Sequence, residues 1–381
     1  MEMKFKNAII YRDDFTFKAG GFTVNSGVFQ SFEEEEDGVD LQGNLVIPGL
    51  IDVHFHGNSG EDFSASDLEG LAKIAGYLAK NGITSFAPAS MTMPEGTLKA
   101  AYETAARFRD RQLGGEMRPG TARILGINME GPFFSHEKKG AQAEAHLMMP
   151  DFAMFERLYE ASGGLLRIVC IAPELPGAMD FIEKAKDRCT VSIAHTAADY
   201  ETAKRAIAAG ATQVTHLYNG MMPFLHRAPG VVGAAAESGQ VMAELICDGA
   251  HIHESVIRAT FSMFSSDRII LISDSLSCLG MPEGVYESGG QKIYMKNGAA
   301  VLEDGVTFAG STTNLFQCMK KAISFGIRPE DAIRAATVNP ARAIRAEGKA
   351  GSISVGKFAD FVVCDKDFNI KGCYVGGEKV D

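Results

Sequence analysis

Short apolar runs recur along the chain from residue 51 onward, and most are followed by a segment with helical periodicity. Continuous apolar runs of this length are typical of strands in a parallel sheet, because helices cover both faces of such a sheet. The predicted strands are 51–56, 83–89, 123–129, 165–171, 190–195, 213–217, 242–247 and 269–273. Strands that alternate with helices at this spacing pair in parallel through right-handed crossovers. The fold class is therefore α/β, with a TIM-type (β/α)8 barrel predicted over residues 50–346.

Helix boundaries are marked by the usual polar and glycine residues. Ser66 and Glu69 resemble a capping box at the start of the apolar stripe 67–80. Gly82 follows that stripe, at the place where a left-handed residue ends a helix. The run 199–209 also has a polar residue at its start and a glycine after its end.

The two ends of the chain have a different pattern. Residues 1–49 form short strand-like segments with no room for a helix, and they include an acidic run, Glu33–Asp37, that is expected to be a solvated turn. After the last predicted helix, near 330–346, strand-like segments return as GSISVG, ADFVVCD and KGCYVGG. We predict that 1–49 and 347–381 fold together as one small β-sandwich beside the barrel.

Histidine and acidic residues lie at or just beyond the ends of the predicted strands. In a (β/α)8 barrel the C-terminal ends of all strands meet on one face, where chemistry is done. The residues in question are His54, His56, Glu130, His195, His216, His251 and Asp274. This distribution predicts a metallohydrolase site.

The pair His54 and His56 is the strongest local signal, because residues i and i+2 of a strand face the same side, about 6.6 Å apart. Two such imidazoles can bind one ion at ~2.0–2.1 Å. A chance pair of polar residues is the alternative for this motif alone. Glu130 precedes Gly-Pro after an apolar run, a poor place for a solvated carboxylate. His195 and His216 could each be a hydrogen-bonded core histidine, but two at successive strand ends favour ligands.

Asp274 follows the eighth predicted strand. It is expected to act as a general acid–base, although a structural carboxylate that caps the next turn is the alternative. His251 lies just beyond a strand end and is expected to steady a carbonyl oxygen. His253 is expected to be a surface residue at a helix start.

Composition narrows the range of possible functions. A formal net charge of −11 argues against broad nucleic-acid binding and against attachment to anionic lipid. The seven cysteines form no CxxC pair and are expected to be reduced thiols of a cytoplasmic protein. MEMKFKNAII does not read as a signal peptide, and no apolar run reaches the ~18–20 residues that span a bilayer. Arg227, in a loop bounded by Gly and Pro, is a candidate cation site for a phosphate.

The ordered motifs resemble those of the amidohydrolase superfamily and, within it, the N-acetylglucosamine-6-phosphate deacetylase family. They are PGLIDVHFHG, MEGPF, KKGAQ, AHT, THLYNGMMPFLHRAPG, CDGAHIH, ISDS, FAGST and the tail GSISVGKFADFVV. The resemblance covers essentially the whole chain. It implies hydrolysis of the acetamide of N-acetyl-D-glucosamine 6-phosphate to D-glucosamine 6-phosphate and acetate, with one or two divalent ions per subunit. Zinc is expected first, with iron, manganese or cobalt as alternatives.

The resemblance also implies roles for individual residues. Glu130, His195 and His216 would hold the principal metal, and His54 and His56 permit a second ion bridged by Glu130. Asp274 would be the catalytic acid–base and His251 would polarise the acetyl carbonyl. The substrate-binding residues would be Ala141, Gln142, Asn219, Gly220, Arg227, His251, Phe308, Ala309 and Gly310.

The substrate-binding residues would meet different parts of the sugar phosphate. Asn219, Gly220 and Arg227 would meet the sugar phosphate, with Arg227 crossing from the neighbouring subunit of a homodimer. Gln142 stands where many members of the family have histidine. It can still hydrogen-bond a sugar hydroxyl but cannot take a charge, so fine sugar specificity stays open.

Other functions remain as alternatives. The galactosamine epimer is the first, because nothing in the sequence decides the C4 configuration. A cyclic-amide hydrolase of the dihydroorotase type usually carries a carboxylated lysine at the end of the fourth strand. This chain reads CIAPE there, with no lysine, which argues against that function. A base deaminase is weakened by the phosphate-type loop. A scaffold that has lost its metal should have lost ligands, and all expected ligands are present.

Overall fold

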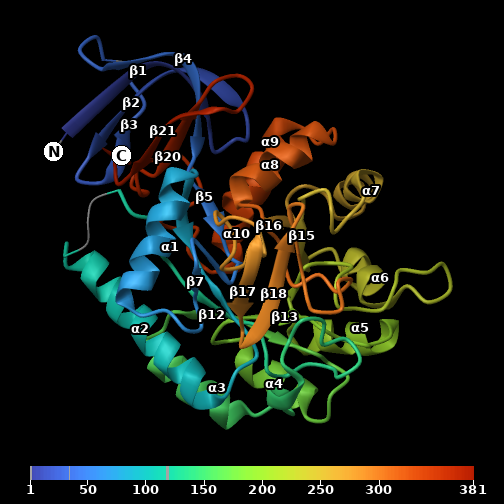
Figure 1. The fold of residues 1–381 in the computed structure, drawn as a ribbon. Helices are drawn as coiled ribbons and strands as arrows, with labels where there is room; N and C mark the ends of the chain where they lie inside the picture. The colour runs from blue at the N-terminus through green and yellow to red at the C-terminus, as the bar shows by residue number, and fades with distance from the viewer. Residues whose placement is uncertain (1, 34, 117–119) are drawn as a thin grey trace.

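The computed structural model describes residues 2–33, 35–116 and 120–381, and it shows a strand barrel with helices around it and a separate β-rich sheet (Figure 1). The barrel strands fall at all eight predicted positions. They are β5 (Leu50–Asp52), β8 (Ile83–Phe86), β9 (Ala89–Ser90), β10 (Arg123–Ile124), β11 (Ile127–Met129), β12 (Leu166–Ile171), β13 (Thr190–Ile193), β14 (Gln213–Val214), β15 (Met242–Ile246) and β16 (Ile269–Ile272). The predicted TIM-type barrel is confirmed.

Two runs of parallel strands make up this barrel. Their orders are β10-β8-β5 and β16-β15-β14-β13-β12-β11-β9. The two runs meet where the segment after β5 lies beside the segment after β16. There the backbone N–H of Asp274 donates to the carbonyl oxygen of His54 at 2.9 Å, which closes the barrel. The N–H of His56 donates in the same way to Ser275 at 2.7 Å. The closure therefore places residues 54, 56 and 274 side by side.

Helices surround the barrel and bury their apolar stripes against it (Figure 1). They are α1 (Leu68–Lys80), α2 (Glu95–Leu113), α3 (Phe152–Ala161), α4 (Ala178–Ala185), α5 (Tyr200–Ala209), α6 (Gly230–Glu237), α7 (Glu254–Phe264), α8 (Leu315–Ser324), α9 (Pro329–Ala336), α10 (Val338–Ala343) and the 3₁₀ turn η1 (Glu144–His146). None of the helices in the described ranges is long and apolar enough to cross a membrane.

The helix ends follow the sequence with one correction. Asp67, and not Ser66, caps α1: its carboxylate accepts two backbone N–H groups of the first turn at 2.9 and 3.0 Å. The Ser66 hydroxyl instead donates to the carbonyl oxygen of Asp62 at 2.7 Å, so it is not free to cap the helix. Gly82 adopts the predicted left-handed conformation, with φ of 78°. Asp199 caps α5 as its pattern suggests, by accepting a backbone N–H at 2.8 Å.

Both ends of the chain contribute to one seven-stranded sheet, ordered β22-β21-β20-β4-β1-β2-β3, at the upper left of Figure 1. Its strands are β1 (Glu2–Tyr11), β2 (Phe17–Asn25), β3 (Val28–Ser31), β4 (Val39–Pro48), β20 (Phe361–Cys364), β21 (Ile370–Val375) and β22 (Glu378–Lys379). Segment 356–359, just before β20, hydrogen-bonds to residues 27 and 29 at the other edge of the order. The sheet thus folds over a phenylalanine core in which Phe5 stacks on Phe22 and Phe361 meets both rings edge-on.

Three further features lay outside the predicted strands or differ from them. GSISVG, at 351–356, forms no strand. A three-stranded sheet of β17 (Gly284–Ser288), β18 (Gln291–Lys296) and β19 (Ala299–Val301) follows β16, and the short pair β6 (Gly57–Asn58) and β7 (Glu61–Asp62) follows β5. Of the acidic run, Glu35 and Asp37 pair with Lys4 at 3.7 and 3.3 Å, and residue 34 lies outside the described residues.

Candidate metal centre

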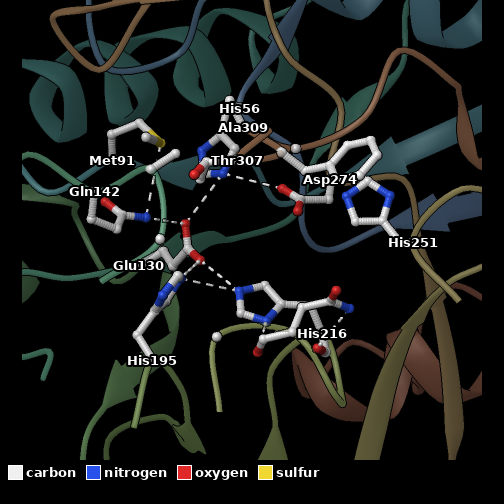
Figure 2. Close-up of a pocket in the computed structure, with 16 residues that line it drawn as sticks. His56, Met91, Glu130, Gln142, His195, His216, His251, Asp274, Thr307 and Ala309 are labelled. Carbon is white, nitrogen blue, oxygen red and sulfur yellow. Dashed lines mark hydrogen bonds and ion pairs between the residues drawn. The ribbon is translucent and has the colours of Figure 1, made fainter. Parts of the chain in front are cut away.

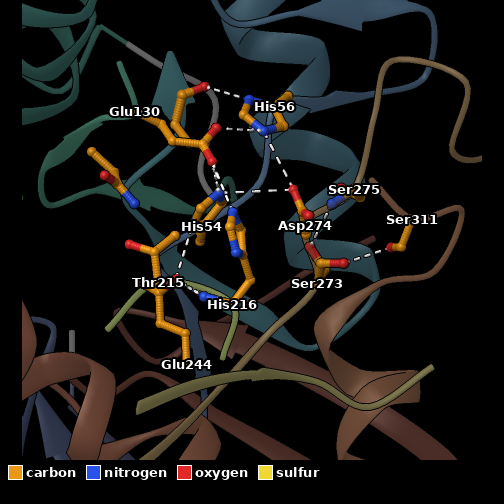
Figure 3. A network of polar contacts seen from close by, with 12 residues as sticks. His54, His56, Glu130, Thr215, His216, Glu244, Ser273, Asp274, Ser275 and Ser311 are labelled. Carbon is orange, nitrogen blue, oxygen red and sulfur yellow. Dashed lines mark hydrogen bonds and ion pairs between the residues drawn. The ribbon is translucent and has the colours of Figure 1, made fainter. Parts of the chain in front are cut away.

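The residues that follow the barrel strands adopt an unusual backbone conformation. His195, His216 and Asp274 have φ values of 43°, 28° and 50°. Residues other than glycine rarely occupy this left-handed region, and such strain is kept mainly at functional sites. All three side chains belong to one cluster at the C-terminal ends of the strands, the face where TIM barrels carry their chemistry (Figures 2 and 3).

The carboxylate of Glu130 lies at the centre of four imidazoles (Figures 2 and 3). Its Oε1 lies 3.1 Å from Nε2 of His195, 3.1 Å from Nε2 of His216 and 3.5 Å from Nε2 of His54. Its Oε2 lies 3.2 Å from Nε2 of His56. All five predicted ligands are buried, so the structure brings the whole set together in one place.

Asp274 completes this cluster from the opposite side. Its Oδ1 lies 3.3 Å from Nε2 of His56 and 3.8 Å from Nε2 of His54. Among the described residues, two groups of three side chains could each hold a metal ion, because their ligand atoms lie within 4.8 Å of one another. His54 belongs to both groups. The groups are His54, His56 and Asp274, and His54, Glu130 and His216.

Two atoms in this cluster indicate that it is built for a metal. Nε2 of His54 and Oδ1 of Asp274 are buried without a hydrogen-bond partner, which is costly for polar atoms in the absence of a ligand. Nε2 of His195 and Nε2 of His216 lie only 3.2 Å apart. A set of imidazole nitrogens and carboxylate oxygens suits a divalent transition metal. The residues present therefore fit a metal centre.

The outward-facing nitrogen of each imidazole supports the same conclusion. Nδ1 of His56, His195 and His216 lies 3.1, 2.8 and 3.2 Å from a backbone carbonyl oxygen. Those oxygens belong to Ala89, Lys138 and Asn219. A carbonyl oxygen only accepts, so each Nδ1 carries a proton, and Nε2 is left as the nitrogen that faces the cluster, the arrangement that is typical of metal-binding histidines.

Charge in the cluster holds both carboxyl groups ionised. Burial alone would raise the pKa of Glu130, but the surrounding imidazoles, His54 above all, hold that pKa well below its usual range. Burial would likewise raise the pKa of Asp274, and the His56 imidazole 3.3 Å away together with nearby histidine charge lowers it. Burial lowers the pKa of His56, whereas its bonds to Asp274 and Glu130 raise it to about 10.

Two glycines allow the loops to approach the cluster closely. Gly220 has φ of 61°, and a Cβ there would lie 2.9 Å from Nδ1 of His195. Gly310 has φ of 104°, and a Cβ there would lie 2.7 Å from the carbonyl oxygen of Asp274. Glycine is therefore required at both positions for backbone conformation and for space.

A cavity of about 280 Å³ opens onto the cluster, and eight of the nine predicted substrate-binding residues line it (Figure 2). They are Ala141, Gln142, Asn219, Gly220, His251, Phe308, Ala309 and Gly310. Arg227 is the exception, because it lies on an exposed loop. Sequence reasoning missed three other lining residues, Met91, Gly140 and Thr307.

His251 is oriented at the cavity wall by a neighbouring carboxylate. Its Nδ1 lies 2.7 Å from Oδ2 of Asp248, and its ring packs against Phe308 with centroids 4.9 Å apart. Burial lowers the pKa of His251, but the hydrogen bond to Asp248 and the charges of Asp248 and Asp274 together outweigh it, so the pKa lies above its ordinary value. His251 is thus held as a hydrogen-bond donor toward the cavity. His253 caps α7 at the surface, as expected.

Gln142 makes two contacts that the sequence did not predict. Its Oε1 accepts the backbone N–H of Thr92 at 2.8 Å, and its Nε2 donates to Oε2 of Glu130 at 2.9 Å. Its side chain is buried between the two. The side-chain amide of Gln142 therefore contacts the central carboxylate directly.

Asp248 and Glu244 are the functional neighbours that sequence reasoning missed. Glu244 is fully buried and lies 2.9 Å from Nδ1 of His54. The available signal was a lone carboxylate inside the otherwise apolar strand MAELI. Asp248 follows the same strand, three residues before His251, a spacing that allows the two side chains to meet.

Comparison with known proteins identifies the relatives of this chain. The model of the amidohydrolase family matches residues 45–380. The N-acetylglucosamine-6-phosphate deacetylase of Bacillus subtilis (strain 168) is 32% identical over 374 residues, which cover 96% of this chain and 93% of the relative. The N-acetylgalactosamine-6-phosphate deacetylase of Escherichia coli O157:H7 is 33% identical over 341 residues, with coverage of 89% and 88%.

A solved structure agrees with these relatives. N-acetyl-D-glucosamine-6-phosphate deacetylase from Mycobacterium smegmatis, in a mutant form in complex with N-acetyl-D-glucosamine-6-phosphate, superimposes with a TM-score of 0.91. It is 29% identical, and the match covers 100% of this chain and 99% of that chain.

Proposed function

The chain belongs to the amidohydrolase family, and on that basis we propose that it is a metal-dependent N-acetyl-D-glucosamine-6-phosphate deacetylase. The reaction adds water across the acetamide of the substrate and gives D-glucosamine 6-phosphate and acetate. The observation that carries the proposal is the convergence of four imidazole Nε2 atoms on Glu130 at a cavity, in a chain whose relatives are deacetylases.

We propose that Glu130, His195 and His216 hold the principal ion, and that His54 and His56 make a second position possible. Zinc is the expected ion, because these sites combine imidazole and carboxylate ligands. When bound, a divalent ion acts as a Lewis acid and lowers the pKa of water to ~7.

Asp274 and His251 carry the proton and the developing charge. The ionised carboxylate of Asp274 accepts a proton from the attacking water and then delivers it to the amide nitrogen, so that the C–N bond breaks and the amine leaves. His251, held as a donor by Asp248, hydrogen-bonds the acetyl oxygen while negative charge develops on it. Water therefore supplies one oxygen of acetate, and its protons pass to the amine.

Binding of the phosphate requires a cation that the cavity does not itself provide. A phosphomonoester carries about −1.5 to −2 charges near neutral pH. Among the described residues that line the cavity there is no lysine or arginine. We propose that Asn219 and Gly220 meet the phosphate together with Arg227, whose planar guanidinium can bind it bidentately.

The loop that carries Arg227 has features of an interface. Met222, Phe224 and Leu225 are 37%, 49% and 53% exposed, which is unusual for three large apolar side chains so close in sequence. We propose that this loop packs on a second copy of the chain in a homodimer, and that Arg227 completes the neighbour's cavity.

A trans-complementation experiment tests this dimer. Arg227→Ala and Asp274→Asn subunits are each expected to be nearly inactive, and they are unfolded, mixed and refolded together. If Arg227 crosses the interface, half of the dimers are mixed and one of the two sites in each is intact, so about a quarter of the wild-type activity returns. If Arg227 serves its own subunit, mixing restores no activity. Co-refolded Asp274→Asn with wild type provides the control for refolding yield, because half of the wild-type activity is expected from it.

The galactosamine epimer is the second candidate substrate, because one relative of similar identity is named N-acetylgalactosamine-6-phosphate deacetylase. The test is kcat/KM for acetate release from the two 6-phosphates. A ratio above about tenfold for the glucosamine compound supports the proposal, and the reverse ratio assigns the epimer.

We also propose a cytoplasmic location. The seven cysteines are all buried and unpaired, as expected for a protein of a reducing compartment. Alkylation of intact and unfolded protein checks this, with seven reactive thiols expected only after unfolding.

A further inference from the structure

Glu244 is a carboxylate buried beneath the metal-binding histidines. It lies on β15, and its side chain is inaccessible to solvent. Transfer of a carboxylate out of water costs several kcal/mol unless hydrogen bonds and charges compensate for it. A residue retained at that cost needs a role that an apolar side chain could not fill.

The contacts of Glu244 show what it does in the fold. Its Oε2 lies 2.9 Å from Nδ1 of His54 and accepts the backbone N–H of His216 at 3.2 Å. Its Oε1 accepts from Nε2 of Gln213 at 2.6 Å. Three donors therefore surround one carboxylate, and two of them belong to the metal cluster (Figure 3).

His54 differs from the other clustered histidines in the partner of its Nδ1 atom. Nδ1 of His56, His195 and His216 meets a backbone carbonyl, whereas Nδ1 of His54 meets the side-chain carboxyl group of Glu244. A carboxylate behind an imidazole fixes the tautomer and makes the opposite nitrogen a better metal ligand. The unpartnered Nε2 of His54 is that opposite nitrogen.

We propose that Glu244 is a positioning residue that establishes the second metal position, the one formed by His54, His56 and Asp274. Glu130, His195 and His216 bind the first ion without help from the Glu244 side chain beyond its bond to one backbone N–H. This inference rests on the proposed metal-dependent function. It adds that a single buried carboxylate determines whether the site holds one ion or two.

The substitution Glu244→Gln tests the role of the charge. Glutamine has the same size and can still accept from His54, but it is neutral, and its amide group then faces the amide of Gln213. Glu183→Gln is the matched control, because it removes the same charge from an exposed position on α4. Circular dichroism and thermal unfolding establish that each variant is folded.

The readout is zinc content after stripping with chelator and titration with zinc, measured by mass spectrometry. Wild type and Glu183→Gln are expected to bind two equivalents. Glu244→Gln is expected to keep one, with affinity for the other lowered by ~10–100-fold, as is typical when a partner behind a metal ligand is lost. Two equivalents in Glu244→Gln with affinities within threefold of wild type would overturn the proposal, and so would a single equivalent in wild type.

A second measurement applies if Glu244→Gln does not fold. Zinc-loaded wild-type protein labelled with ¹⁵N-histidine is compared with His54→Asn, which identifies the His54 signals. The expected spectrum has a protonated Nδ1 and a metal-bound Nε2 at His54, and an unprotonated Nδ1 or a metal-free Nε2 would refute the assignment. Absence of acetate release from protein with two bound ions would instead count against the deacetylase, so the two failures are distinguishable.

Discussion

Replacement of Asp274 by asparagine tests the role of this carboxylate in proton transfer. The carboxylate is almost fully buried, and although burial would raise its pKa, the His56 imidazole 3.3 Å from Oδ1 and the nearby histidine charge lower it. It is therefore an ionised base at neutral pH. Asparagine has nearly the same shape but cannot take a proton.

The size of the effect follows from these roles. General acid–base groups typically contribute ~10²–10⁴ in rate, which corresponds to ~3–5 kcal/mol of barrier at 1.36 kcal/mol per tenfold. Metal content should change far less, because Asp274 belongs to only one of the two candidate ligand groups. The ion at Glu130, His195 and His216 should remain.

The assay measures kcat and KM from acetate release, together with metal content of the same preparation. We expect kcat to fall by at least a hundredfold while at least one equivalent of metal is retained. A variant that keeps more than a tenth of the wild-type rate would refute the acid–base role. Recovery of activity in excess metal would show that Asp274 acts mainly as a ligand.

Two further predictions concern neighbours of the cluster. Asp248→Asn removes the carboxylate that raises the pKa of His251, so the alkaline limb of the kcat profile should move to lower pH. The stability contributed by this pair is full between about pH 4 and 6.5, and it is lost as pH rises through the raised pKa of His251 or falls through the lowered pKa of Asp248. Superimposable pH profiles and urea midpoints would contradict this. Gly220→Ala should displace His195 and weaken metal binding by about tenfold or more. The control is Gly76→Ala, in open space within α1, which should stabilise the helix by ~0.5–1 kcal/mol and leave metal content unchanged. Unaltered zinc content in the first variant would argue against the close approach.

The barrel and the metal cluster were predictable because both depend on local pattern. Buried parallel strands are apolar on both faces, so a histidine or acid at the end of such a run is conspicuous. The rule that strand ends meet on one face then brings together His54, Glu130, His195 and His216, which are far apart in sequence. Those side chains lie within hydrogen-bond distance of one another, or nearly so, in the structure.

The partners behind the ligands were not predictable in the same way. Glu244 meets His54 across 190 positions of sequence, through a barrel register that no local pattern specifies. Gln142 contacts Glu130 because a loop folds over the cluster, and loops carry no periodicity. The strands β17, β18 and β19 are short and mostly solvent-facing, so they lack the apolar runs that marked the barrel strands.

Acetate release from N-acetyl-D-glucosamine 6-phosphate is the most direct test of the proposed function. Zinc-reconstituted and chelator-stripped protein are each assayed with this sugar and with unphosphorylated N-acetyl-D-glucosamine. We predict rapid turnover of the phosphorylated sugar by the zinc form alone, with at least a hundredfold lower kcat/KM for the unphosphorylated one. Activity that survives stripping of the metal, or no turnover of the phosphorylated sugar by the reconstituted protein, would contradict it.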